Sequence, residues 1–111
     1  MSPVASDPCV LEVVDRSDHG VVARLSGDLD IVTAERITAE LAALIEAGHE
    51  RVTLDVGGLG FVDSSGLGAL VTVHRRAQAH DGSLVLRSVP PRVRRLLEIT
   101  RLDELLAIEG E

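Results

Sequence analysis

The chain contains no Lys, Trp or Tyr, and Phe61 is its single aromatic residue. Without Lys, Schiff-base and pyridoxal chemistry and a Lys-anchored phosphate loop are excluded. Without an aromatic platform for stacking bases, single-stranded nucleic-acid binding is disfavoured. The one cysteine, Cys9, cannot form an internal disulfide, which fits a reducing compartment. We expect Cys9 to pack as a small hydrophobe near the start of a strand.

The chain also lacks an apolar run of the roughly 20 residues that a membrane helix needs. Residues 1–8 show neither the basic nor the apolar region of a secretory signal, and we expect them to form a flexible N-terminal tail. Residues 9–111 then make one domain, since folded domains commonly hold about 100–150 residues. The net charge of −7 argues against a polyanion binder. We therefore expect a cytoplasmic protein that neither inserts into membranes nor binds nucleic acid directly.

Apolar periodicity predicts alternating strands and helices. Val-rich runs at residues 10–14 and 21–25, separated by a polar stretch with Gly20, predict a hairpin, and Gly27 permits a turn after the second run. Apolar residues at helical spacing predict a helix from about Thr33, as its cap, to Ala47, with Gly48 ending it. Period-two alternation predicts a strand over residues 51–56, and a Gly-rich turn over residues 57–60.

The second half continues the alternation. A second helix begins at Ser64 or Ser65 and ends by Gly82, and residues 83–87 form a short strand. Pro90-Pro91 opens a third helix, because Pro suits the first helical turn. Residues 102–108 are ambiguous between helix and strand. The order predicts an α/β domain with a mixed β-sheet of four to five strands, packed against helices and opening with a β-hairpin.

Charge is unevenly distributed along the chain. Residues 1–70 hold four Arg and twelve acids, whereas residues 71–102 hold seven Arg and two acids, a net charge of +5. Ordinary solvated helix faces would explain this distribution. A surface divided by charge, which orients a protein partner, is the alternative.

The segment Phe61-Val62-Asp63-Ser64-Ser65-Gly66-Leu67-Gly68 joins a strand to an amphipathic helix. Ser64 or Ser65 is the N-cap or the first helical residue, where the positive end of the helix would tolerate a phosphoryl group. Gly66 and Gly68 keep the approach open to a partner. The alternative is a plain helix cap with glycines for a tight turn.

Catalysis and metal binding find little support. The serines lack the G-x-S-x-G pattern of a nucleophile elbow, and no His is placed by sequence as their base. His74 and His80 are six residues apart, against the four-residue spacing of a zinc-binding helix. We predict no catalytic residues, no metal site and no bound cofactor.

A second informative segment is Gly27-Asp28-Leu29-Asp30-Ile31-Val32-Thr33-Ala34, in which two acids flank a leucine just before the first helix. By itself it indicates a turn with negative charge at a helix N-terminus, worth a few tenths to about 1 kcal/mol.

Together the two segments resemble the STAS-domain anti-sigma-factor antagonists of bacteria. The match runs from Gly27-Asp28-Leu29-Asp30 and Thr33-Ala34 through Asp63–Gly68 to Pro91 and Arg95-Leu96-Leu97, over roughly residues 9–110. The resemblance implies a protein that binds an anti-sigma factor with serine kinase activity and releases the sigma factor. It also implies that the kinase uses ATP to phosphorylate Ser64, with Ser65 as the alternative site, and that a serine phosphatase reverses this. The implied partner-binding residues are Asp28, Asp30, Asp63, Ser64, Ser65, Gly66, Leu67 and Gly68.

The sequence departs from the family pattern at one position, and the family also includes proteins with another function. The family usually carries Gly after the Thr of the third helix, whereas Arg101 follows Thr100 here, so the end of that helix is open. Other stand-alone STAS proteins are not switched by phosphorylation and serve stress-signalling or lipid-transport complexes. A non-switched scaffold or small subunit is therefore the alternative function. The oligomeric state is left open.

Overall fold

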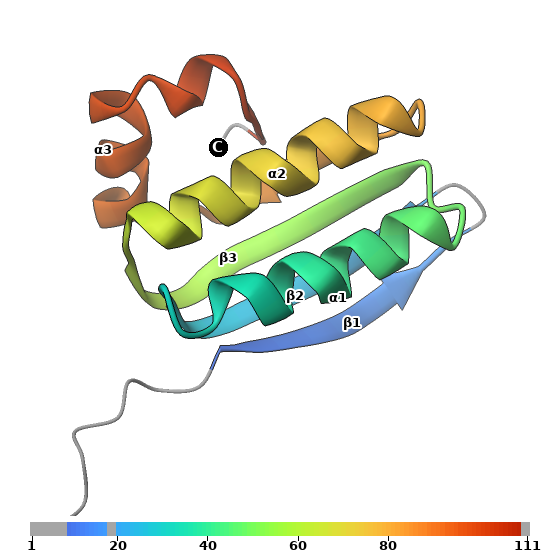
Figure 1. Ribbon diagram of the computed structural model, residues 1–111, viewed down its shortest axis with the longest axis horizontal. Helices are drawn as coiled ribbons and strands as arrows, with labels where there is room; N and C mark the ends of the chain where they lie inside the picture. The colour runs from blue at the N-terminus through green and yellow to red at the C-terminus, as the bar shows by residue number, and fades with distance from the viewer. Residues whose placement is uncertain (1–8, 18–19, 110–111) are drawn as a thin grey trace, which may run out of the picture.

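The computed structural model describes residues 9–17 and 20–109, so the tail predicted for residues 1–8 lies outside the described part. Strands and helices alternate after an opening pair of strands (Figure 1). In chain order the elements are β1 (Val10–Arg16), β2 (Gly20–Leu29), α1 (Ala34–Glu46), β3 (Arg51–Val62), α2 (Ser64–Ala79), β4 (Ser83–Arg87), α3 (Pro91–Ile99), the 3₁₀ turn η1 (Leu102–Glu104) and β5 (Ala107–Ile108).

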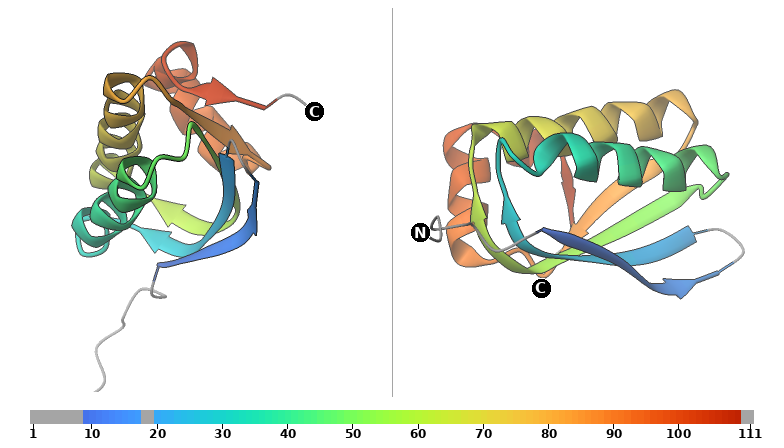
Figure 2. Two further views of the ribbon diagram at one scale, coloured as in Figure 1. Left: turned by 90° about the vertical axis from the view of Figure 1, so that its right-hand side faces the viewer. Right: turned by 60° about the horizontal axis from the view of Figure 1, so that its bottom comes forward.

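The five strands form one sheet in the order β1-β2-β3-β4-β5. β1 is antiparallel to β2, and the remaining pairs are parallel. The α/β class, the opening hairpin and the mixed sheet are therefore confirmed. α1 and α2 lie side by side on one face of the sheet (Figure 2). α3 lies across the end of the domain where β3 ends and α2 begins (Figure 1). Of the described helices, none combines the length and apolar character needed to cross a bilayer.

The core lies between the sheet and the two long helices. Val52, Leu54 and Val56 of β3 are fully buried, as the period-two pattern predicts. α1 contributes Ile37, Leu41 and Ile45, and α2 contributes Leu70 and Val73, from one stripe of each helix. Cys9, 1% exposed, joins this core just before β1, as expected.

The sheet face turned away from α1 and α2 carries a row of charges that crosses β1 to β4 and ends just after β5. Glu12 is in register with Arg24, Arg24 with Asp55, and Asp55 with Arg87. Arg87 in turn donates from Nε to Glu109 Oε1 at 3.0 Å, just after β5. The sign of the charge alternates at every step along this row.

The turn predicted at residues 57–60 is wrong, because β3 continues through the glycines to Val62 and β2 continues to Leu29. The two strands pair in parallel over this extension, with register shifts between Arg24 and Ser26 and after Gly27. A Cβ on Gly58 would lie 2.8 Å from the Cβ of Ser26. Glycine therefore permits close strand approach here, and the chain does not turn.

The segment after α3 resolves the two points left open by the sequence. α3 starts with Pro91 and ends at Ile99, and Arg101 adopts the left-handed conformation with φ 62° and ψ 18°. The conformation that favours Gly is therefore kept, with Arg in its place. Residues 102–108 divide into the 3₁₀ turn and the two-residue strand β5, so neither a single helix nor a single strand describes them.

Candidate functional site

The N-terminus of α2 is capped by Asp63. Its Oδ1 accepts a hydrogen bond from the backbone N–H of Gly66 at 2.9 Å. Ser64 is therefore the first helical residue, one of the two positions expected from the sequence, and its side chain is exposed. Ser65 is half-buried. Of the two candidate serines, Ser64 is the more accessible to another protein.

Asp63 also joins α2 to the loop between β2 and α1. Its Oδ2 accepts a hydrogen bond from the backbone N–H of Ile31 at 3.2 Å. Its own N–H donates to the carbonyl of Leu29 at 3.3 Å. The two segments singled out in the sequence, 33 residues apart at Asp30 and Asp63, therefore lie side by side in the fold.

The buried side chain of Asp30 holds the backbone of the loop between β2 and α1. It is 6% exposed, and its Oδ1 accepts hydrogen bonds from the N–H groups of Val32 at 3.0 Å and Thr33 at 3.2 Å. Thr33 occupies the N-cap position of α1 but its side chain makes no capping bond, contrary to the prediction. Its hydroxyl donates instead to the carbonyl of Asp28 at 2.8 Å. Asp28 itself is half-buried.

Two exposed apolar side chains complete the surface. Ile31 is 75% exposed and Val32 is 81% exposed, at the tip of the loop that Asp30 and Asp63 hold. Both residues lie within the second segment singled out in the sequence, but neither was among the predicted partner-binding residues. The available signal was a pair of β-branched apolar residues in a loop, outside any strand or helical stripe. Adjacent exposed apolar side chains of this kind mark surfaces that contact other molecules.

Gly66, Leu67 and Gly68 occupy different environments. Gly66 is buried, and a Cβ there would lie 2.2 Å from the carbonyl oxygen of Leu29. The expectation that Gly66 keeps an approach open is therefore wrong, since it allows α2 to contact β2. Leu67 is 7% exposed and packs in the core. Gly68 is exposed with open space around its Cβ position, so the expectation of an open approach holds at this residue.

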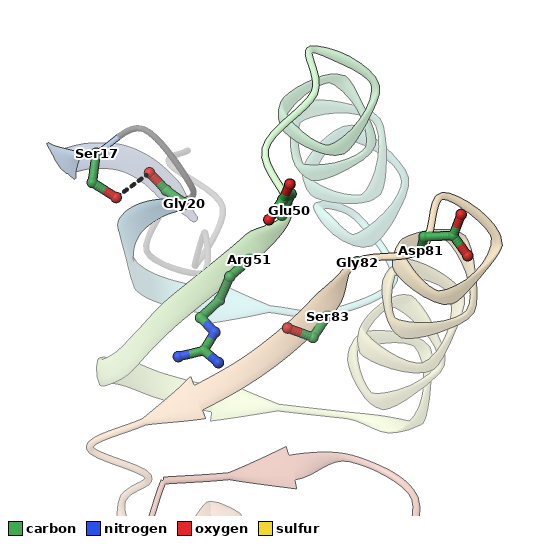
Figure 3. Close-up of a pocket in the computed structure, with 7 residues that line it drawn as sticks. All are labelled: Ser17, Gly20, Glu50, Arg51, Asp81, Gly82 and Ser83. Carbon is green, nitrogen blue, oxygen red and sulfur yellow. Dashed lines mark hydrogen bonds between the residues drawn. The ribbon is translucent and has the colours of Figure 1, made fainter.

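A separate hollow of about 440 Å³ lies at the opposite end of β3 (Figure 3). Glu50, Arg51, Asp81 and Ser83 contribute side chains to it, and the hydroxyl of Ser17 donates to the carbonyl of Gly20 at 3.4 Å. It lies where β3 and β4 begin, whereas Ser64 follows the end of β3. Within residues 9–17 and 20–109, no group of three or more His, Cys, Asp or Glu is placed to hold a metal ion.

The fold and the helix start define a small mixed-sheet domain that presents a serine beside an apolar loop. The family model described as "Mlab, STAS domain" matches residues 12–107. BtrV of Bordetella bronchiseptica, described as an anti-sigma factor antagonist, is 37% identical over 87 residues, covering 78% of this chain and 75% of BtrV. The anti-sigma-B factor antagonist of Bacillus subtilis strain 168 is 26% identical, covering 88% of this chain and 89% of its own. The chain belongs to the STAS domain family.

Solved structures agree with this assignment. The anti-sigma factor antagonist SpoIIAA in its unphosphorylated form superposes with a TM-score of 0.75 at 27% identity, over 92% of this chain and 90% of SpoIIAA. The phosphorylated form of SpoIIAA, a Bacillus cell fate determinant, gives 0.69 at 26% identity, over 92% of this chain and 93% of the other. The names of these relatives all describe anti-sigma factor antagonists.

Proposed function

We propose that the chain is an anti-sigma-factor antagonist that binds an anti-sigma factor with serine kinase activity through the surface around Ser64. The observation that carries this proposal is the exposed Ser64 at the start of α2, joined through Asp63 to the exposed Ile31. A partner covering this surface would bury two apolar side chains and contact the serine hydroxyl together. Binding would release the sigma factor, in the cytoplasm and without catalysis by this chain.

Phosphorylation of Ser64 by the bound kinase would switch this contact off. A phosphoserine adds about −1.5 to −2 charges at neutral pH. Asp63 is the neighbouring residue, and the half-buried Asp28 lies in the adjoining segment of β2, so the added charge would intensify a negative region. The N-terminus of α2 tolerates an anion, so the fold would persist while the interface is lost. SpoIIAA has a known structure in each phosphorylation state, which supports such a switch in the family.

The test uses the purified chain and its cognate kinase, identified as the protein that this chain retains from a lysate of its own host. After incubation with ATP, mass spectrometry locates the phosphate. We expect Ser64 to carry it, and Ser65→Ala to be phosphorylated as the native chain is. Phosphate on neither serine, with a kinase active on another substrate, would refute the switch. A serine phosphatase from the same host should remove the phosphate and restore kinase binding.

Binding measurements separate charge from fold. Ser64→Ala should bind the kinase whether or not ATP is present, and Ser64→Asp should bind at least tenfold more weakly. Thr72→Asp is the matched control, because Thr72 is an exposed hydroxyl residue on the same helix, two turns from Ser64. It should bind as the native chain does. Equal affinities of the alanine and aspartate variants at Ser64 would contradict the electrostatic account.

The second candidate is a non-switched STAS scaffold or small subunit of a stress-signalling or lipid-transport complex. The observation that favours it is the description of the matching family model, "Mlab, STAS domain". Under this function the chain would retain a membrane ATPase complex rather than a kinase. Ser64→Asp would then leave the amount of retained partner unchanged.

A further inference from the structure

A groove of about 340 Å³ separates the end of β3 from α3 and is unused by the proposed function. Its wall on the sheet side is made by residues 59–62, and its wall on the helix side by α3 and the preceding Pro90. Phe61 is 51% exposed and Ile99 is 69% exposed at this groove. The half-buried Leu96 and the buried Val93 extend the apolar lining. Phe61, the single aromatic residue of the chain, therefore faces solvent.

Two cations border this apolar lining. Arg92 and Arg95 both line the groove and are exposed, and no acid pairs with either of them within the described residues. The neighbouring Arg94 differs, since its Nε lies 3.8 Å from Glu98 Oε2. Arg92 and Arg95 are three residues apart on one helix and therefore lie on the same side of α3, about one turn apart.

The apolar lining and the two bordering cations together indicate which kind of molecule the groove can bind. The apolar lining calls for bulky aliphatic or aromatic side chains, and the paired guanidinium groups call for carboxylates. Two cations one turn apart match two acids at the same spacing on a partner helix, which would balance both charges. A single fatty-acid carboxylate carries one negative charge and would leave a net charge of +1 at the site. The helix α3 is nine residues long, about 13 Å at the rise of an α-helix, and such a length suits two to three turns of a partner helix.

We propose that the groove between β3 and α3 is a docking site for an acidic amphipathic helix of a protein partner. The docked helix inserts its apolar side chains between Phe61 and Ile99 and places its acids against Arg92 and Arg95. The groove ends at Val62, and neither Asp63 nor Ser64 lines it. The docking does not depend on the phosphorylation state of Ser64, so it stands apart from the switch proposed above.

The test measures binding of a synthetic helical peptide to the full-length chain labelled with ¹⁵N. The probe is a 14-residue peptide with a Leu stripe flanked by pairs of Glu, and its controls carry Gln or Lys at every Glu. We expect amide shifts confined to residues 59–62 and 92–99. The Gln peptide should bind at least tenfold more weakly than the Glu peptide, and the Lys peptide should not bind.

Variants of the groove residues test which side chains contact the peptide. The double variant Arg92→Glu with Arg95→Glu should lose the Glu peptide and gain the Lys peptide, which a merely unfolded protein would not do. Ile99→Ser should weaken binding at least fivefold, since it removes an exposed apolar contact. Arg75→Glu is the matched control: Arg75 is an exposed cation on α2 that does not line the groove, and its replacement should change binding less than twofold.

Several outcomes would overturn the proposal. They are shifts that map away from the groove, equal binding of the Glu and Lys peptides, or an unchanged affinity of the double variant. Binding of dodecanoate in the groove with no binding of the Glu peptide would make the site a lipid site and also refute it. Ser64→Asp should bind the Glu peptide as the native chain does, so failure of the switch and failure of the docking site remain distinguishable.

Discussion

The carboxylate of Asp63 accepts the backbone N–H of Ile31 at 3.2 Å, which fastens the loop before α1 to the start of α2. The same side chain caps α2 through its other oxygen. One residue thus positions both the serine-bearing helix turn and the exposed apolar loop tip. Its contribution to the site is geometric, in addition to the negative charge that it brings.

Replacing Asp63 should separate these two tasks. Asp63→Ala removes both acceptors and should lower the free energy of unfolding by about 1–2 kcal/mol, the usual cost of a lost N-cap. Asp63→Asn keeps one carbonyl oxygen for Gly66 but loses the second acceptor, and should cost less. Urea denaturation measures both values, and hydrogen exchange at the Ile31 amide should quicken in both variants. An Ile31 amide that stays protected in Asp63→Ala would contradict the assigned bond.

Gly66 and Gly68 form a matched pair two residues apart. Gly66→Ala would bring a Cβ within 2.2 Å of the Leu29 carbonyl, where backbone must move, and should destabilise the fold by about 3 kcal/mol. Gly68→Ala meets open space and should stabilise α2 by about 0.5–1 kcal/mol, since Ala has the higher helix propensity. Thermal unfolding of both variants gives the comparison. A similar loss in both would show that the contact with β2 does not distinguish them.

His74 is buried on α2, and neither of its ring nitrogens has a hydrogen-bond partner within the described residues. Burial of an unpaired polar group costs about 1–3 kcal/mol. His74→Leu should therefore raise the free energy of unfolding by about 1 kcal/mol, measured by urea denaturation at pH 7.5. His74→Gln keeps a polar group in the same place and should give no gain. A loss of stability in the leucine variant, with the glutamine variant unaffected, would reveal a polar role for the ring.

Burial raises the pKa of the Cys9 thiol to about 11, against an opposing effect of the nearby Arg36 guanidinium. At pH 8 about one thiol in a thousand is then ionised, so Ellman's reagent should react far more slowly with the native chain than with the urea-unfolded chain. The thiol also links stability to pH. Because the folded state holds its proton more tightly, this contribution is complete below pH 9 and is lost as the pH rises towards 11.

The control for this linkage is Cys9→Ala. Its free energy of unfolding should fall less than that of the native chain between pH 8.5 and 10.5, when both are measured by urea denaturation. Parallel pH profiles of the two proteins would show that the thiol does not carry the effect. Rapid modification of the native chain at pH 8 would contradict the burial of Cys9.

Periodicity in the sequence predicted the class of the fold, because the core depends on alternation that a single chain displays, as at Val52, Leu54 and Val56. The turn predicted at residues 57–60 is wrong because glycine permits both a turn and the close approach of two strands. Only the partner strand decides between the two. The same ambiguity applied to Gly66. Ser64 was predicted from its place before a helical stripe, whereas Ile31 and Val32 follow no period and became visible only with the loop in place.

The row of alternating charges on the outer sheet face has a consequence for how the strands find one another. A slip of one strand by two residues would keep its apolar side chains towards α1 and α2, so burial discriminates weakly against that error. The same slip of β3 would take Asp55 away from Arg24 on one side and from Arg87 on the other. Opposite charges across strands contribute about 0.2–1 kcal/mol each. The charged side chains of the outer face therefore specify the alignment of the strands independently of the packing of apolar side chains on the inner face.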